Sequence, residues 1–511
     1  MVVRIPDVAG AAADARGAGA RGADAFATAL AGFAHRLKPQ AIPRSIIDRG
    51  SHLLLDAIGC GLAARRESFA TRSVDAIAAL AGGDLLGPDP GPGSTAGAAG
   101  LLPVVGFARR LPLRDAMLAN GVLCHGLDYD DTHVAGVVHL TAAVAPAVLA
   151  LASQRAASGA DAIAAYVAGV EVGARIAALA SGGFHAKGFH PTGVVGTFAA
   201  ATACASLMGL DASGVLGAHG MALSFASGSL QFLDDGAWTK RFQPGWAAQA
   251  GLQAAHFAAH GIPAPAAPLG GRFGLYANYL GDATAPSPAA LEAAARRVDD
   301  RDAPDDWELS NVAVKPFPLC HLVHASADAA IALRAGGVAH EAIERVDVLV
   351  PAPTMPVIGL PQPAKRRPRS DYEAKFSVHY AVASGLLRGR VGLAELAPAA
   401  YTDPAALALM DRIECIADPD ADFPRYYGGA VRVTLVDGSR RSWREAVNRG
   451  HAERPLDDAA IHAKFIENAC LHFSRAHADA IADAVLGLAS SADLSRLDAL
   501  LATDPCGAPA R

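Results

Sequence analysis

The sequence is poor in cysteine and in aromatic residues. Cysteine accounts for seven of its 511 residues, no two of them form a CxxC pair, and aromatic residues make up 6% of the chain. Scattered cysteines are typical of a reducing compartment and argue against a structural zinc site or an iron–sulfur cluster. We therefore expect a cytoplasmic protein that uses no metal ion and no organic cofactor.

Several motifs that define enzyme classes are also absent. The chain contains no GxxxxGK[ST], HExxH or GxSxG motif, which removes support for ATP hydrolysis, zincin chemistry and α/β-hydrolase chemistry. Its formal net charge is −6, so nucleic acid is not expected as a partner. We find no apolar run of about 20 residues without polar interruption, so a membrane is not expected as a partner either.

The chain is rich in hydrophobic residues and in helical periodicity. Hydrophobic residues make up 52% of it, which is enough for a large core and two domains. Residues 1–23 are rich in Ala and Gly and are predicted to form a disordered tail. From Asp24 onward, apolar residues recur at helical spacing, which predicts a mainly α fold.

The pattern changes after about residue 280. Valines occupy every second position from Val346 to Val350, and residues 431–447 are predicted to form two strands joined at a turn, Asp437-Gly438. We therefore predict a large all-helical domain followed by a smaller α+β domain. Helices are also expected over residues 321–335, 373–387 and 461–490.

Carboxylates and histidines crowd the segment 121–145, which contains Asp128, Asp130, Asp131, His125, His133 and His139. Carboxylates this close raise each other's pKa unless cations or hydrogen-bond donors face them, and acid–base sites use that tension. In a helix, His125, Asp128 and Thr132 would share one face. The alternative is an Asp-rich helix end whose carboxylates are solvated.

Polar clusters precede three apolar helical runs. His139 stands just before Thr141, a candidate N-cap; His190 precedes a second run; and Lys240 and Arg241 precede a third. A helix N-terminus exposes unpaired amide donors and favours anions. If the three ends converge, they form a carboxylate-binding pocket; the alternative is three ordinary capped helices.

Seven segments together identify the chain as a member of the MmgE/PrpD family, which includes 2-methylcitrate dehydratase, cis-aconitate decarboxylase and iminodisuccinate epimerase. The resemblance runs from about residue 25 to about residue 490. The segments are HLLLDAIGCGLA (52–63), ANGVLCHGLDYDDTH (119–133), VHLTAAVAPAVLA (138–150), GFHPTGVVGTFAAA (188–201), TKRFQPGWAAQAG (239–251), VKPFPLCHLVHASADA (314–329) and EAKFSVHYAVA (373–383).

The resemblance implies a domain arrangement and a set of site residues. The large helical domain comprises residues 24–280 and 455–505, and residues 281–454 form a lid inserted near the C-terminal end. A homodimer is expected. The implied catalytic residues are Asp128, His139 and His190, and the implied substrate-binding residues are Thr132, Lys240 and Lys315, of which only Lys315 comes from the small domain.

The leading functional hypothesis is a cofactor-free hydro-lyase that dehydrates a small tricarboxylate such as 2-methylcitrate by general acid–base catalysis. The alternatives are an epimerase or isomerase of an imino- or amino-dicarboxylate, a cis-aconitate-type decarboxylase, and a catalytically silent protein that binds di- or tricarboxylates. Proton-transfer groups beside the lysines argue against a silent binder, which needs only the cations.

Two departures from the family pattern bear on these alternatives. The dehydratase-like sequence HPS is replaced by His139-Leu140-Thr141. The decarboxylase branch also places a tyrosine from the small domain in the substrate pocket. Residues 351–370 contain no tyrosine, and Tyr372 is the nearest, which argues against decarboxylation.

Overall fold

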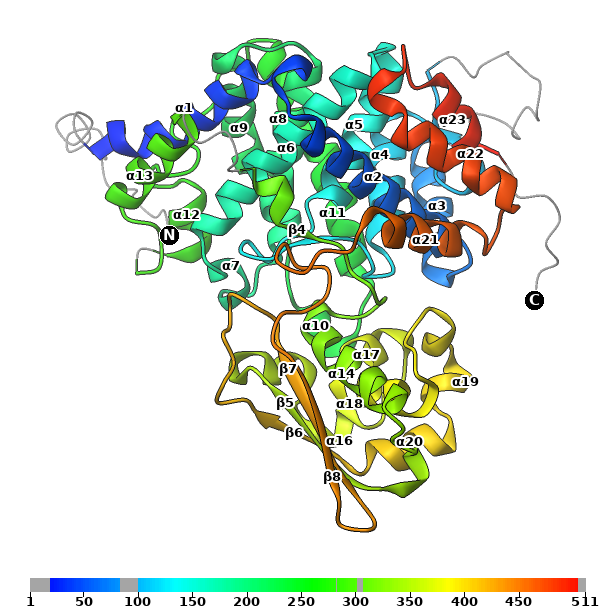
Figure 1. The fold of residues 1–511 in the computed structure, drawn as a ribbon. Coiled ribbons are helices and arrows are strands. Elements are labelled where there is room, and N and C mark those ends of the chain that lie inside the picture. The colour runs from blue at the N-terminus through cyan, green and yellow to red at the C-terminus, as the bar shows by residue number, and fades with distance from the viewer. Residues whose placement is uncertain (1–18, 83–99, 282, 301–306, 504–511) are drawn as a thin grey trace, which may run out of the picture.

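The computed structural model describes residues 19–82, 100–281, 283–300 and 307–503, and in these residues helices predominate (Figure 1). A mainly α fold is therefore confirmed. The chain folds into two bodies. A helical body fills the upper part of Figure 1, and a small body below it contains the largest sheet.

The helical body contains most of the helices and two short antiparallel strand pairs. Its helices are α1 (Gly19–Arg36), α2 (Arg44–Ala64), α3 (Ser68–Leu80), α4 (Leu113–His125), α5 (Thr141–Arg155), α6 (Gly159–Leu179), α7 (Gly183–Ala186), α8 (Pro191–Leu207), α9 (Ala212–Phe225), α11 (Thr239–Ala259), α12 (Leu275–Leu280), α13 (Pro288–Asp299), α21 (Asp458–Ala469), α22 (Arg475–Leu486) and α23 (Ser495–Leu501). Its strands are β1 (Leu102–Val104), β2 (Phe107–Leu111), β3 (Thr132–His133) and β4 (Val312–Ala313), paired β1–β2 and β3–β4.

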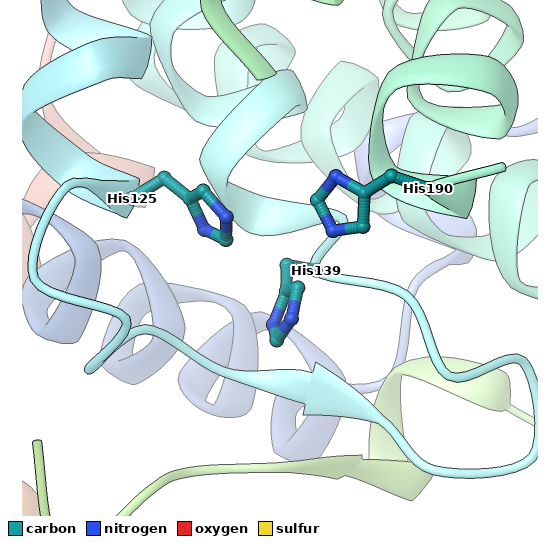
Figure 2. Close-up of side chains that lie close together, drawn as sticks. All are labelled: His125, His139 and His190. Atoms are coloured by element: carbon teal, nitrogen blue, oxygen red, sulfur yellow. The ribbon is translucent and has the colours of Figure 1, made fainter. Parts of the chain in front are cut away.

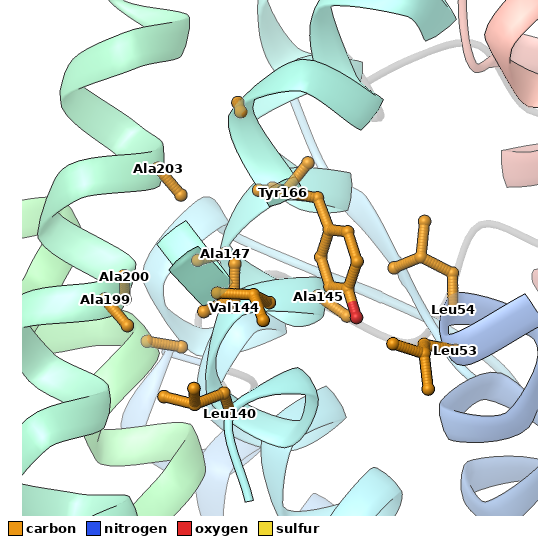
Figure 3. Packing of buried hydrophobic residues seen from close by; sticks show 14 of the residues in the cluster. Leu53, Leu54, Leu140, Val144, Ala145, Ala147, Tyr166, Ala199, Ala200 and Ala203 are labelled. Atoms are coloured by element: carbon orange, nitrogen blue, oxygen red, sulfur yellow. The ribbon is translucent and has the colours of Figure 1, made fainter. Parts of the chain in front are cut away.

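Helix α8 lies at the centre of this body and packs against α5, α6, α9 and α11. Every residue from Pro191 to Ala205 is buried, as expected for a helix that is apolar on all sides. Figure 3 shows alanines of α8 facing the start of α5. Small residues also let α4 approach α11: a Cβ on Gly121 would lie only 2.4 Å from Cα of Gly245. This close contact brings the end of α4 beside the start of α11.

Helix α6 is the one helix among the described residues that is long and apolar enough to cross a membrane. It does not contradict the expectation from the sequence, because Asp161, Glu171 and Arg175 interrupt its apolar run. Of its most apolar window, 83% is buried inside the protein. Packing against α5 and α8 therefore accounts for its apolar composition.

The small body is built on a four-stranded sheet of order β6–β5–β7–β8, in which β5 runs parallel to β6 and antiparallel to β7. The hairpin predicted over residues 431–447 is confirmed: β7 and β8 pair antiparallel, and Gly438 adopts φ +80° in the turn. The strands are β5 (Ile343–Val350), β6 (Ile413–Ala417), β7 (Gly429–Leu435) and β8 (Arg440–Glu445). The helices are α10 (Phe232–Asp235), α14 (His324–Ala335), α15 (Met355–Ile358), α16 (Gln362–Lys365), α17 (Asp371–Lys375), α18 (Val378–Arg388), α19 (Pro398–Tyr401) and α20 (Pro404–Met410).

Several predicted boundaries shift. Residues 1–18 of the predicted tail lie outside the described residues, and α1 begins at Gly19, before Asp24. The helix predicted over residues 373–387 is two helices, because the Ser377 side chain caps the start of α18. The helix predicted over residues 461–490 is likewise divided, and Ser474 caps α22.

The described residues form two large hydrophobic cores and one small cluster of Val134, Ala313 and Tyr427. One core contains Phe232 and then residues between Phe317 and Val433. The other contains the remaining helices and includes Leu291 and Ala295 of α13, which packs against α1. The structure therefore places α13 with the helical body, whereas the sequence predicted a change of domain near residue 281. The reason is the apolar face of α13, which α1 covers.

Candidate active site

The acidic segment is a loop, not a helix. Helix α4 ends at His125, and Asp128 adopts a left-handed φ of +54°. His125, Asp128 and Thr132 therefore do not share one face of a helix, which the sequence predicted for a helical segment. The loop leads into β3, which pairs with β4. Asp128, Asp130 and Asp131 are all buried, which rules out the alternative that the segment is an Asp-rich helix end with solvated carboxylates.

Two lysines face the Asp128 carboxylate. Lys240 Nζ lies 2.8 Å and Lys315 Nζ 2.7 Å from Asp128 Oδ1, and Lys315 Nζ also donates to the Asp128 carbonyl at 2.9 Å. Lys240 lies in the first turn of α11, and Lys315 follows β4. Burial raises the pKa of Asp128, but the two ammonium groups outweigh it and hold that pKa well below its usual range. The group thus carries two positive charges and one negative charge.

Three histidines surround a common space beside this group (Figure 2). The ring centroids of His125 and His139 are 4.9 Å apart, those of His125 and His190 5.7 Å, and those of His139 and His190 6.0 Å. Burial lowers the pKa of all three imidazoles, and Lys315 and Lys240 lower those of His139 and His190 further. The rings are therefore neutral at pH 7 and can exchange protons with a ligand.

A protein acceptor orients each ring. His125 Nδ1 lies 2.8 Å from Asp130 Oδ2, and His139 Nδ1 lies 2.6 Å from the Asp131 carbonyl. His190 Nδ1 lies 2.6 Å from Gln243 Oε1, whose amide nitrogen donates to Ser229. Each of these oxygens accepts a hydrogen bond from Nδ1–H, so Nε2 of each neutral ring keeps its lone pair.

Three further residues named from the sequence, Thr132, His133 and Thr141, have different contacts in the structure. Thr132 Oγ1 lies 3.2 Å from His139 Nδ1, so it supports that ring. His133 instead pairs with Glu308 at 2.9 Å, outside the histidine group. The expected N-cap Thr141 is wrong: Leu140 is the N-cap residue of α5, and the Thr141 hydroxyl contacts Tyr166 at 2.7 Å.

Sequence reasoning assigned no site role to His125, Lys375 or Tyr372. Lys375 lies in segment 373–383, one of the seven that carry the family resemblance. Its Nζ donates to the Leu127 carbonyl at 2.8 Å, and burial lowers its pKa to about 8. The Tyr372 ring lies 6.4 Å from that of Phe232, which lies 6.0 Å from His190. Its buried hydroxyl has no hydrogen-bond partner within the described part of the chain. A tyrosine of the small body therefore does approach the site.

Comparisons with known proteins agree with the resemblance. A family model of the MmgE/PrpD N-terminal domain matches residues 28–287, and one of the MmgE/PrpD C-terminal domain matches residues 317–488. The chain is 26% identical over 491 residues to the cis-aconitate decarboxylase-like protein oryM of Aspergillus oryzae, covering 92% of this chain and 96% of the relative. It is 29% identical over 499 residues to cis-aconitate decarboxylase of Homo sapiens, covering 94% of each chain, and 28% identical over 496 residues to that of Mus musculus, covering 92% of each. Because the two family models together match most of its length, the chain belongs to the MmgE/PrpD family.

Proposed function

We propose that this protein is a lyase of small tricarboxylates and that it decarboxylates a substrate resembling cis-aconitate. The observation that carries the proposal is the pair of ammonium groups on Asp128 beside three neutral imidazoles. Relatives named as cis-aconitate decarboxylases favour loss of carbon dioxide over loss of water. Decarboxylation thus replaces dehydration as the leading hypothesis.

The lysines have donors left for a substrate carboxylate. An ammonium group has three N–H donors; Lys240 uses one on Asp128, and Lys315 uses two. Two donors on Lys240 and one on Lys315 therefore remain, and the net charge of the three side chains is +1. This positive charge offsets the negative charge of an incoming carboxylate. In a buried site a charged group needs an opposite charge beside it.

The histidines supply the proton. When an allylic carboxylate leaves as carbon dioxide, its bonding electrons form a new double bond, and the former double bond takes a proton at its far carbon. A bound anion beside His139 or His190 raises the pKa of that imidazole, so the ring takes up a proton and becomes a general acid. A ring that then donates this proton to carbon returns to its neutral state.

Dehydration of a β-hydroxy tricarboxylate is the second candidate, because residues 351–370 contain no tyrosine. The same groups serve it: one imidazole removes a proton beside a carboxylate, and another protonates the departing hydroxyl. Epimerisation requires only return of the proton to the opposite face.

One experiment separates these reactions. Purified protein is incubated with cis-aconitate, 2-methylcitrate, citrate and dicarboxylate analogues in deuterated water and followed by NMR and by carbon dioxide release. The proposal predicts carbon dioxide release and one carbon-bound deuterium per turnover from a cis-aconitate-like substrate. Water loss without carbon dioxide would establish the second candidate, solvent exchange alone would indicate epimerisation, and binding without turnover would overturn a catalytic function.

We expect Tyr372→Phe to lower kcat/KM by about 10- to 100-fold, the scale of one hydrogen bond to a charged group. The Tyr372 hydroxyl is buried and has no partner among the described residues, which fits a donor that a substrate satisfies. Because removing an unsatisfied polar group does not weaken the free protein, the melting temperature should stay the same or rise. The control is Tyr426→Phe, whose hydroxyl contacts Glu453 at the surface. Unchanged kinetics in Tyr372→Phe would show that this hydroxyl does not contact the substrate.

A further inference from the structure

The three site histidines share an arrangement that proton transfer alone does not require. In each ring Nδ1 has a protein acceptor, and Nε2 has no hydrogen-bond partner in the part of the chain that the structure describes. Nε2 of His125 is fully buried and unpartnered. This nitrogen is an acceptor without a donor, and a buried polar atom without a partner calls for an explanation.

The spacing of the rings fits one metal ion. One nitrogen from each of His125, His139 and His190 lies within 4.8 Å of the others. Three imidazoles that bind a tetrahedral Zn²⁺ through nitrogens at about 2.0–2.1 Å have ring centroids about 5 Å apart. The observed separations of 4.9, 5.7 and 6.0 Å are close to or somewhat above this value, so binding an ion would draw the three rings together by side-chain rotation.

The surroundings of the rings also match those of metal ligands. Histidines that bind zinc almost always donate their other N–H to a carboxylate, a carbonyl or water, which fixes the ring and strengthens its basicity. Here Asp130 provides a carboxylate, Asp131 a backbone carbonyl and Gln243 an amide oxygen. The His139 side chain is 12% exposed, which leaves a side open to a fourth ligand.

We propose that Nε2 of His125, His139 and His190 together bind one divalent transition-metal ion such as Zn²⁺, with the fourth position left to water or a carboxylate. Metal binding at this site does not depend on the proposed function. The expected inhibition rests on the proposed function: an ion on the Nε2 lone pairs prevents the imidazoles from carrying protons, so zinc reversibly inhibits the lyase reaction.

Cobalt tests the site without an activity assay. Chelator-treated full-length protein is titrated with Co²⁺ and followed by visible absorption, and with Zn²⁺ by calorimetry. We expect one tight site per chain and the intense absorption bands of low-coordinate cobalt. His125→Gln should weaken binding at least about 100-fold, and Asp130→Asn, which alters only the support of the ring, about 10- to 100-fold.

A surface histidine pair provides the control. His256 of α11 and His260, which directly follows that helix, are exposed with ring centroids 4.5 Å apart and offer an ordinary two-histidine surface site. A variant carrying His256→Gln and His260→Gln should keep the tight site and its spectrum. Loss of tight binding in that variant, or unchanged affinity in both His125→Gln and Asp130→Asn with normal melting curves, would overturn the proposal.

The inhibitory role has its own readout. With the substrate that the deuterium experiment identifies, one equivalent of Zn²⁺ should abolish turnover, and adding a chelator should restore turnover. A chelator alone should not reduce turnover. Stimulation by Zn²⁺ would overturn the inhibitory role. If no substrate is turned over, the proposed function fails, while the cobalt spectrum still decides whether the metal site exists.

Discussion

His139→Ala and His190→Ala should each lower turnover about 10²- to 10⁴-fold, the usual contribution of a positioned general acid or base. Both rings lie within the group that adjoins the lysines, and each is oriented by a protein acceptor at 2.6 Å. The expected loss therefore appears mainly in kcat. The measurement is steady-state turnover of the identified substrate, with circular dichroism to verify folding.

The control for this prediction is His256→Ala, which removes an exposed imidazole from α11 at a distance from the candidate residues. It should leave kcat unchanged. If His139→Ala and His190→Ala both retain near wild-type turnover while folded normally, neither ring transfers the proton, and the catalytic assignment of these residues is wrong.

The sequence predicted the individual residues of the site better than their grouping. Lys240 and Lys315 lie 112 and 187 positions from Asp128, so only the tertiary fold brings their ammonium groups to one carboxylate oxygen. The family resemblance named all three residues. It did not indicate that Asp128 pairs with both lysines, so that its carboxylate is the partner of two ammonium groups instead of a free base.

His125 shows where a local pattern fails. It ends α4 and looked like one more residue of an acidic helix, but the left-handed Asp128 turns the following chain. That turn directs Asp130 back to the His125 ring at 2.8 Å. The positive φ of one non-glycine residue is not apparent in the sequence, and neither, therefore, was the contact between Asp130 and His125.

Regular elements with strong local signals were predicted well. The hairpin of β7 and β8 follows from alternation and an Asp-Gly turn, both local properties. The domain boundary predicted near residue 281 was misplaced. The segment before α13 is polar and contains proline, but the apolar face of α13 packs on α1, which is distant in the sequence. Packing between segments far apart in the chain decided this point.

Removing either site lysine should weaken tricarboxylate binding by about 1.5 to 3 kcal/mol, the scale of a charge-assisted hydrogen bond. Lys240→Met or Lys315→Met changes the net charge of the three side chains from +1 to zero, so Asp128 offsets the remaining ammonium group and an anion is no longer attracted. Calorimetry with the unreacted substrate or a tricarboxylate analogue measures the loss. Lys187→Met, which removes an exposed lysine, is the control and should bind normally.

The two losses should also couple, because both ammonium groups contact the same Asp128 oxygen and act on one ligand. The double variant should therefore differ from the sum of the single variants by at least about 0.5 kcal/mol. Lys315 follows β4 at the junction with the small body, whereas Lys240 begins α11 of the helical body, so coupling would support a lid that completes the site on closing. Additive losses would show that the lysines act independently. Unchanged affinity in both single variants would refute the carboxylate site itself.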